Sequence, residues 1–73
     1  MHTPATTLAD HIARTRASLL AEWDGNARYY PFVTDGIAHD VLLYCALTGT
    51  TVPAGVLTDK DTVAHFVEAV RQA

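Results

Sequence analysis

The fold is decided by residues 34–49, which read TDGIAHDVLLYCALTG. The hydroxyl of Thr34 can accept a free backbone N–H of a first helical turn, and Gly49 stands where helices commonly end in a left-handed residue. Between these two residues, from position 37 onward, the sequence is apolar apart from one His-Asp pair and the final threonine. This pattern predicts a helix from about Asp35 to Thr48 that is buried at the centre of a small bundle.

A buried strand is the rival interpretation of Val41–Leu47, because periodicity does not separate helix from strand over so few residues. The strand would pair with residues 51–57, giving an α+β fold with a hairpin at 41–57. Pro53 and Gly55 would then lie inside the return strand, where both disfavour pairing. Leucine and alanine content and the distance from cap to glycine favour the helix, and the hairpin stays as the alternative.

The clearest helical pattern follows this region. Residues 58–61 read TDKD, a candidate capping threonine followed by acids that suit the positive end of a helix. Apolar residues then recur at helical spacing, namely Val63, Phe66, Val67 and Val70. The opposite face is polar, so we expect an amphipathic helix here.

Another helical pattern runs from about Leu8 to Asp24. Thr7 is its expected N-cap, and Gly25 its expected terminating glycine. Asp10 and Arg14 have the i,i+4 spacing of a surface ion pair. The apolar face consists of Leu8, Ile12, Leu19, Leu20 and Trp23.

These patterns predict an all-α fold, a small three-helix bundle formed as one helical domain over residues 1–73, with residues 1–6 disordered. Trp23, Tyr44 and Phe66 are the expected large core residues. A chain this short buries only about 60% of the surface that its unfolded form exposes. The hydrophobic content of 49% nevertheless argues for a folded chain.

Residues 25–33, which we name the aromatic connection, join the first two helices. Pro31 cannot sit inside a helix and pushes Tyr30 toward an extended conformation. Because side chains alternate along an extended chain, Tyr30 and Phe32 should point to one side and Tyr29 to the other. Both sides are apolar, so one can pack on the core while the other needs a second cover.

The apolar side that the core does not cover is the main indication of function. It indicates a protein-binding surface, because Tyr, Trp and Arg are enriched at the hot spots of protein interfaces. The predicted partner-binding residues are Arg28, Tyr29, Tyr30 and Phe32.

The net charge of −3 comes from the second half of the chain. No basic cluster is present, which counts against direct binding of nucleic acid. The acids of the last helix are possible steering charges toward a basic patch on a partner. They are Asp59, Asp61 and Glu68.

Patterns for metal binding and catalysis are weak. Asp35–His39 and Asp61–His65 have i,i+4 spacing and could combine with Cys45 at a metal, yet no compact ligand motif appears. Cys45 lies in the apolar run, where a thiol usually behaves as a small hydrophobe. We therefore expect no metal, no cofactor, no catalytic residue and no enzymatic activity.

The start of the chain lacks the features of a signal peptide, and no apolar run is long enough to span a membrane. We expect a cytoplasmic, non-enzymatic module that docks on a larger protein as an inhibitor or accessory factor. A phage-encoded factor aimed at a host RNA polymerase or nuclease is one example, based on size and acidity alone. The alternatives are a structural homo-oligomer such as a homodimer, and a small nucleic-acid-binding or metal-binding helical domain.

Overall fold

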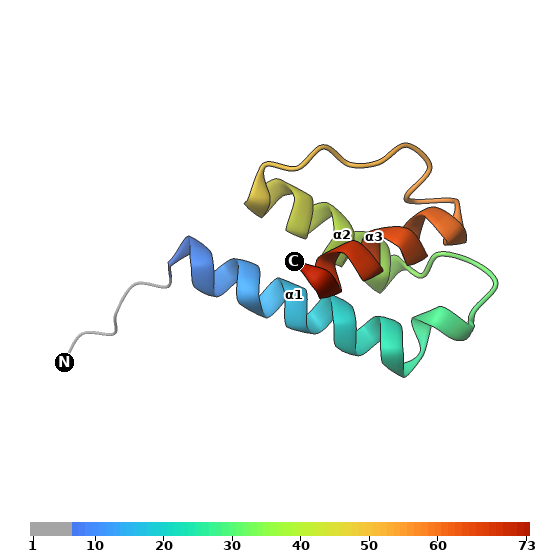
Figure 1. Cartoon of the computed structure of the whole chain (residues 1–73). Helices are drawn as coiled ribbons and strands as arrows, with labels where there is room; N and C mark the ends of the chain where they lie inside the picture. The colour runs from blue at the N-terminus through green and yellow to red at the C-terminus, as the bar shows by residue number, and fades with distance from the viewer. Residues whose placement is uncertain (1–6) are drawn as a thin grey trace.

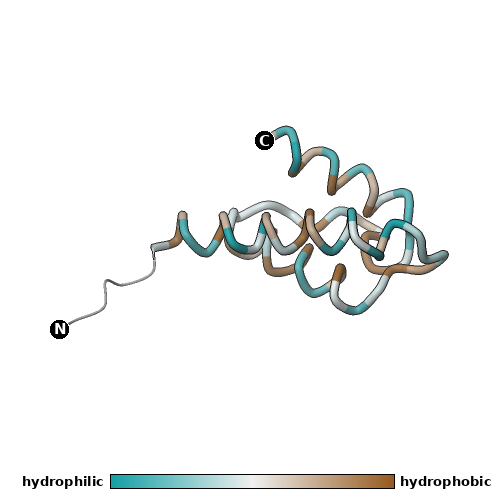
Figure 2. The backbone as a smooth tube through the Cα atoms, turned by 90° about the horizontal axis from the view of Figure 1, so that it is seen from below, coloured by the Kyte–Doolittle hydropathy of each residue, from teal (hydrophilic) through white to brown (hydrophobic). Residues whose placement is uncertain are grey.

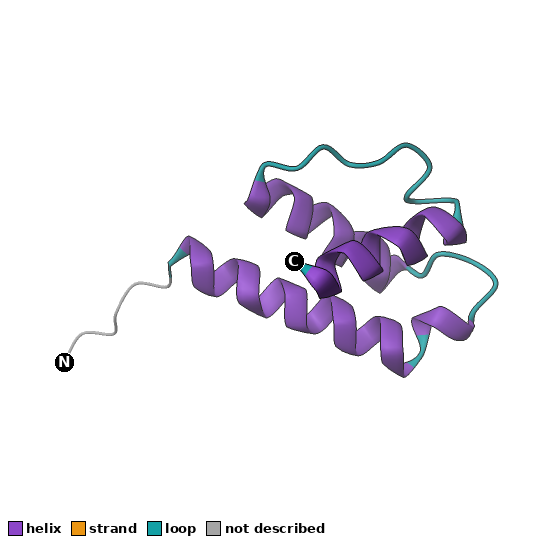
Figure 3. Cartoon of the chain, viewed as in Figure 1, coloured by secondary structure: helices purple, strands orange, loops and turns teal. Residues whose placement is uncertain are grey.

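The computed structural model describes residues 7–73, and this part of the chain contains three α-helices and no strand. The helices are α1 (Leu8–Gly25), α2 (Asp35–Thr48) and α3 (Lys60–Gln72), with a short 3-10 helix, η1 (Ala27–Tyr29), after α1 (Figures 1 and 3). The all-α, three-helix prediction is confirmed, and the hairpin alternative is wrong. The disorder expected for residues 1–6 lies outside the described residues.

Local caps explain where α1 and α2 begin. Thr7 accepts from the backbone N–H of Asp10 at 3.2 Å, and the Asp10 carboxylate accepts from the N–H of Thr7 at 3.3 Å, which completes a capping box. Asp10 is thus engaged in the cap rather than in the expected ion pair with Arg14. Thr34 caps α2 as predicted, accepting from the N–H of Ile37 at 3.3 Å.

The helix ends agree with the sequence patterns at α2 and differ at two other places. Gly49 ends α2 with φ of 70°, the left-handed geometry that glycine adopts without strain. Gly25 instead remains inside α1, and Asn26 is the C-cap. Asp59 rather than Thr58 caps α3, because a carboxylate competes well for free N–H groups and accepts from the N–H of Asp61 at 3.1 Å.

The helix α1 runs opposite to α2 and α3, which point in the same general direction (Figure 1). The segment 49–59 therefore crosses back along the bundle before α3 begins. Val56, only 2% exposed, anchors this crossing segment in the core. Seen from below, α3 shows the expected alternation of hydrophilic and hydrophobic residues along its turns (Figure 2).

The core consists of the Trp23 side chain and smaller apolar side chains from the three helices, from η1 and from the crossing segment 49–59. They are Leu19, Trp23, Ala27, Ile37, Val41, Cys45, Val56, Val63, Val67 and Val70. Trp23 is buried as predicted, whereas Tyr44 and Phe66 are only half-buried and pack edge to face at 6.1 Å between ring centroids.

Two apolar faces are less covered than the sequence suggests. We expected α2 to be surrounded, yet Leu42 and Leu43 are 41% and 39% exposed, because two neighbouring helices cover only one side of it. Leu8 is 58% exposed, because the end of α3 reaches only the middle of α1 (Figure 1).

Polar side chains tie α1 to α3. The Arg16 guanidinium donates to the carbonyls of Val70 at 3.1 Å and Arg71 at 2.9 Å, in the last turn of α3 where helix carbonyls lack partners further along the helix. The Val70 carbonyl also accepts from the N–H of Ala73 at 3.3 Å. Arg71 in turn forms a two-pronged ion pair with Asp24, with N–O distances of 2.7 and 3.0 Å.

Candidate protein-binding surface

Gly25, the first residue of the aromatic connection, still belongs to α1, and after Asn26 the connection forms the 3-10 turn η1 and becomes extended at Tyr30. The N–H of Tyr29 donates to the Asn26 carbonyl at 3.0 Å, and that of Tyr30 to the Ala27 carbonyl at 3.3 Å. Tyr30 has φ of −83° and ψ of 145°, as expected for a residue before proline. The extended conformation expected at Tyr29 is wrong, because Ala27 is buried in the core and begins the short turn there.

The rings of this segment remain largely uncovered. Tyr29 is 71% exposed, Tyr30 44% and Phe32 58%. Tyr30 and Phe32 lie on the same side, as alternation predicts, and stack with 5.5 Å between ring centroids and 20° between planes. Val33, next along the chain, packs against the core.

Arg28 lies beside the rings, with its guanidinium carbon 5.2 Å from the centroid of Tyr29. This distance fits a cation–π contact. The four predicted partner-binding residues lie within residues 28–32, on the segment that joins the end of α1 to the start of α2 (Figure 1). We name the set Arg28, Tyr29, Tyr30 and Phe32 the aromatic surface.

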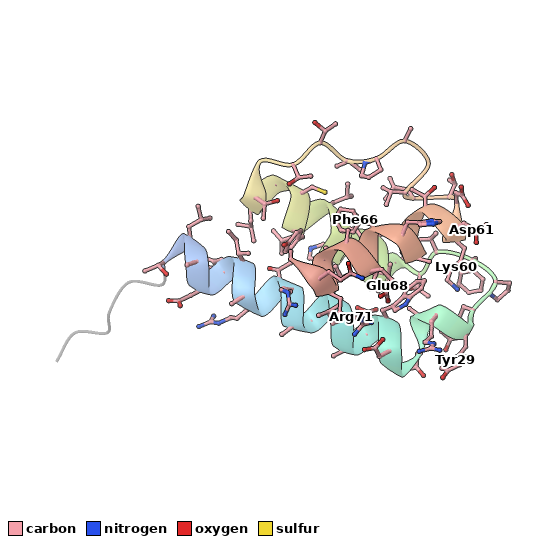
Figure 4. The ribbon with its side chains drawn as sticks, viewed as in Figure 1. Tyr29, Lys60, Asp61, Phe66, Glu68 and Arg71 are labelled. Atoms are coloured by element: carbon pink, nitrogen blue, oxygen red, sulfur yellow. The ribbon has the colours of Figure 1, made fainter. Side chains whose placement is uncertain are left out.

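Lys60, the first residue of α3, binds the aromatic connection through its side chain. The sequence did not predict this contact. The Lys60 ammonium donates to the carbonyl of Arg28 at 3.2 Å and to that of Tyr30, and it lies 5.2 Å from the centroid of the Trp23 ring. Figure 4 shows Lys60 and Tyr29 at the same end of the molecule. The available signal was a lysine at the first position of a helix, where the dipole disfavours a cation.

The three possible steering charges have different surroundings. Asp59 accepts from the hydroxyl of Thr62 at 2.9 Å in addition to capping α3. Glu68 pairs with Arg71 at 3.3 Å. Asp61 is exposed, and within residues 7–73 its carboxylate forms no hydrogen bond or ion pair, so it keeps the most effective charge of the three (Figure 4).

The candidate metal ligands do not gather in the described part of the chain, where no group of three or more potential ligands occurs. Nδ1 of His65 contacts the Asp61 carbonyl at 2.9 Å, and Nδ1 of His39 lies 3.6 Å from the Asp40 carboxylate. Cys45 is 2% exposed, and burial raises the pKa of its thiol, which disfavours the reactive thiolate.

Comparison with protein-family models, with curated proteins and with solved structures found no match. Among the helices of residues 7–73, none combines the length and apolar character needed to cross a bilayer.

Proposed function

We propose that this chain is a non-enzymatic binding module that docks on a larger protein through the aromatic surface. The observation that supports the proposal is the exposure of three neighbouring rings, between 44% and 71%, on a segment tied to the bundle by Lys60. Aromatic rings with an arginine beside them are typical of interface hot spots, because they bury much area with few rotatable bonds. Docking would occlude or displace another ligand at the partner's surface, as an inhibitor or accessory factor does.

The partner's face is expected to be basic around its apolar centre. The chain carries a net charge of −3, and the exposed Asp61 lies close to Lys60 at the end of the bundle that bears the aromatic surface (Figure 4). Opposite charges speed association more than they strengthen the complex. The rate of association should therefore fall as salt concentration rises, while the dissociation rate changes little. The buried thiol of Cys45 is compatible with an encounter in the cytoplasm.

The test is a comparison of two double variants as affinity baits in an extract of the native host. Tyr30→Ala/Phe32→Ala removes the stacked rings, and Leu42→Ala/Leu43→Ala removes apolar side chains of similar exposure on α2. Proteins retained by the wild type and by the α2 variant, but lost with the ring variant, are then purified and their Kd measured by calorimetry. We expect at least about a tenfold loss of affinity for the ring variant.

The fold provides the control for that experiment. Because both rings are exposed, the ring variant should keep its helical circular dichroism spectrum. A ring variant that retains every partner of the wild type would remove the proposed site, and one that loses its helices would place the rings among the structural residues.

Self-association is the second candidate, and the exposed Leu8, Leu42 and Leu43 favour it. A copy of the chain could cover these side chains, which lie on α1 and α2. Light scattering of the purified protein separates the two candidates, since a dimer that persists on dilution favours self-association. The α2 double variant should then be monomeric.

A further inference from the structure

Lys60 occupies a position that α3 itself does not favour. It is the first residue of the helix, where the backbone N–H groups create a partial positive charge that repels a cation. The negative cap of α3 is Asp59, whose carboxylate accepts from the N–H of Asp61 at 3.1 Å. The Lys60 side chain instead reaches groups far away in the sequence.

Those groups all belong to the end of α1 and to the aromatic connection. The Arg28 and Tyr30 carbonyls accept from the ammonium, and the Trp23 ring lies 5.2 Å from it. Each of these groups attracts a positive charge, so together they offset its unfavourable place at the start of the helix. We infer that Lys60 is the positioning residue that fixes the aromatic surface in one conformation, and that it sets partner affinity by this ordering rather than by contact.

The aromatic connection has few other restraints. In the described part of the chain, the backbone of residues 30–33 makes one further hydrogen bond, from the N–H of Tyr30 to the Ala27 carbonyl. Pro31 has no N–H to donate. Between the buried Ala27 and the packed Val33, Lys60 therefore supplies the side-chain hydrogen bonds that residues 7–73 make to the backbone of the segment that carries the rings.

An ordered segment binds better because its conformational entropy is already lost before the partner arrives. If one residue has to become ordered during binding, the entropy cost of fixing its backbone raises the Kd by about tenfold. Removing the ammonium should thus lower affinity without removing any contact side chain. This consequence rests on the proposed function, whereas the ordering itself does not.

The experiment measures order directly, by backbone heteronuclear NOEs in three variants and the wild type. Lys60→Met keeps the apolar stem against Trp23 and removes the ammonium. Lys60→Arg keeps a cation that can donate to both carbonyls, and Asp61→Asn alters the next residue as a control. We expect lower NOEs at Tyr30, Phe32 and Val33 in Lys60→Met alone, with amide protection in the three helices unchanged.

The wild type supplies a second measurement that does not depend on how a variant folds. A cation over the Trp23 ring places the ε protons of Lys60 in the ring current, so their signals should shift upfield and show NOEs to the indole. Absence of that shift overturns the inference, as does an aromatic connection equally rigid in Lys60→Met. Loss of all helical signals in Lys60→Met would make Lys60 a residue of general stability and overturn it as well.

The partner found with the ring variant then tests the functional consequence. Its Kd for Lys60→Met should rise about tenfold, and Lys60→Arg should recover most of the affinity. Unchanged affinity despite a disordered connection would overturn the link to binding. An ordered connection with no partner would instead remove the proposed function and leave the role of Lys60 in place.

Discussion

At the scale of single residues, the contact between α1 and α2 contains two carboxyl groups side by side. Asp40 is 8% exposed and accepts from the Ser18 hydroxyl at 3.0 Å. The carboxylate of Glu22 lies over Gly36, where a Cβ atom would come within 2.0 Å of it. Burial, then the charge of Asp40 and a hydrogen bond with it, raise the pKa of Glu22, while His39 opposes the rise. The absence of a side chain at Gly36 gives Glu22 its place.

Replacing Glu22 with glutamine should stabilise the fold at neutral pH. The pKa of Glu22 is higher in the folded state than its usual value of 4.5. The contribution of Glu22 to folding stability is therefore fully present below pH 4.5 and is lost as the pH rises through the folded-state pKa. Glutamine removes the like-charge contact that develops there, so we expect a gain of about 0.5 kcal/mol near neutral pH. The gain should vanish in acid. Urea denaturation of the variant and the wild type, at neutral pH and at a pH well below 4.5, measures the gain under each condition. An equal gain at both pH values would contradict the like-charge contact between Glu22 and Asp40.

Asp24 is the matched control, with the opposite sign. Its hydrogen bonds with Arg71 hold its pKa below the usual 3.8, so its contribution to stability is present above that value and is lost as pH falls through the lowered one. Asp24→Asn should therefore destabilise the protein at neutral pH, and the difference from the wild type should shrink in acid.

At the scale of the helices, a glycine near a helix end does not always terminate the helix. Gly49 has φ of 70° and its N–H donates to the Cys45 carbonyl, so it terminates α2 in the left-handed region. Gly25 lies within α1 and has no atom within 4 Å of the position of an added Cβ. Substitution by alanine should thus be destabilising at Gly49 but not at Gly25.

Gly49→Ala should lower the free energy of unfolding by about 1 kcal/mol, because a Cβ is strained at this φ. Gly25→Ala should leave stability unchanged or raise it by about 0.5 kcal/mol, because alanine loses less entropy in a helix. Urea denaturation of both variants gives the comparison. Equal losses at the two positions would mean that α1 also ends in a left-handed glycine.

At the scale of the whole molecule, few side chains are fully enclosed. Leu19, Val41, Val63 and Val67 are 0% exposed, while larger apolar side chains elsewhere stay partly in solvent. Small domains with a limited core have little stability in reserve. A cavity at the centre should consequently cost much of the folding free energy, whereas truncation at the exposed side of α2 should not.

Leu19→Ala should destabilise the protein by about 2–5 kcal/mol, by lost transfer energy and by the cavity left behind. Leu42→Ala, at a position 41% exposed, should cost less than about 1 kcal/mol. Thermal melting followed by circular dichroism compares them. If Leu42→Ala were as damaging as Leu19→Ala, the outer side of α2 would have to be covered, as self-association would do.

The sequence alone determined the helices, because their signals are local. Thr7, Thr34 and Gly49 have the predicted capping roles, and the apolar spacing of α3 places Val63, Val67 and Val70 in the core. A cap depends on neighbours a few residues away, and helical spacing depends on the geometry of one element. The extended conformation of Tyr30 follows in the same way from the proline after it.

Only the tertiary structure decided which apolar residues are enclosed and which are left on the surface. Tyr44 and Phe66 are half-buried, and Leu8, Leu42 and the rings of the aromatic surface are exposed, because enclosure depends on where other helices end and cross. The Lys60 contacts join α3 to a segment about thirty residues earlier, and no pattern within either segment specifies that meeting. Helices form from local hydrogen bonds, whereas the surface they leave uncovered is a property of their packing.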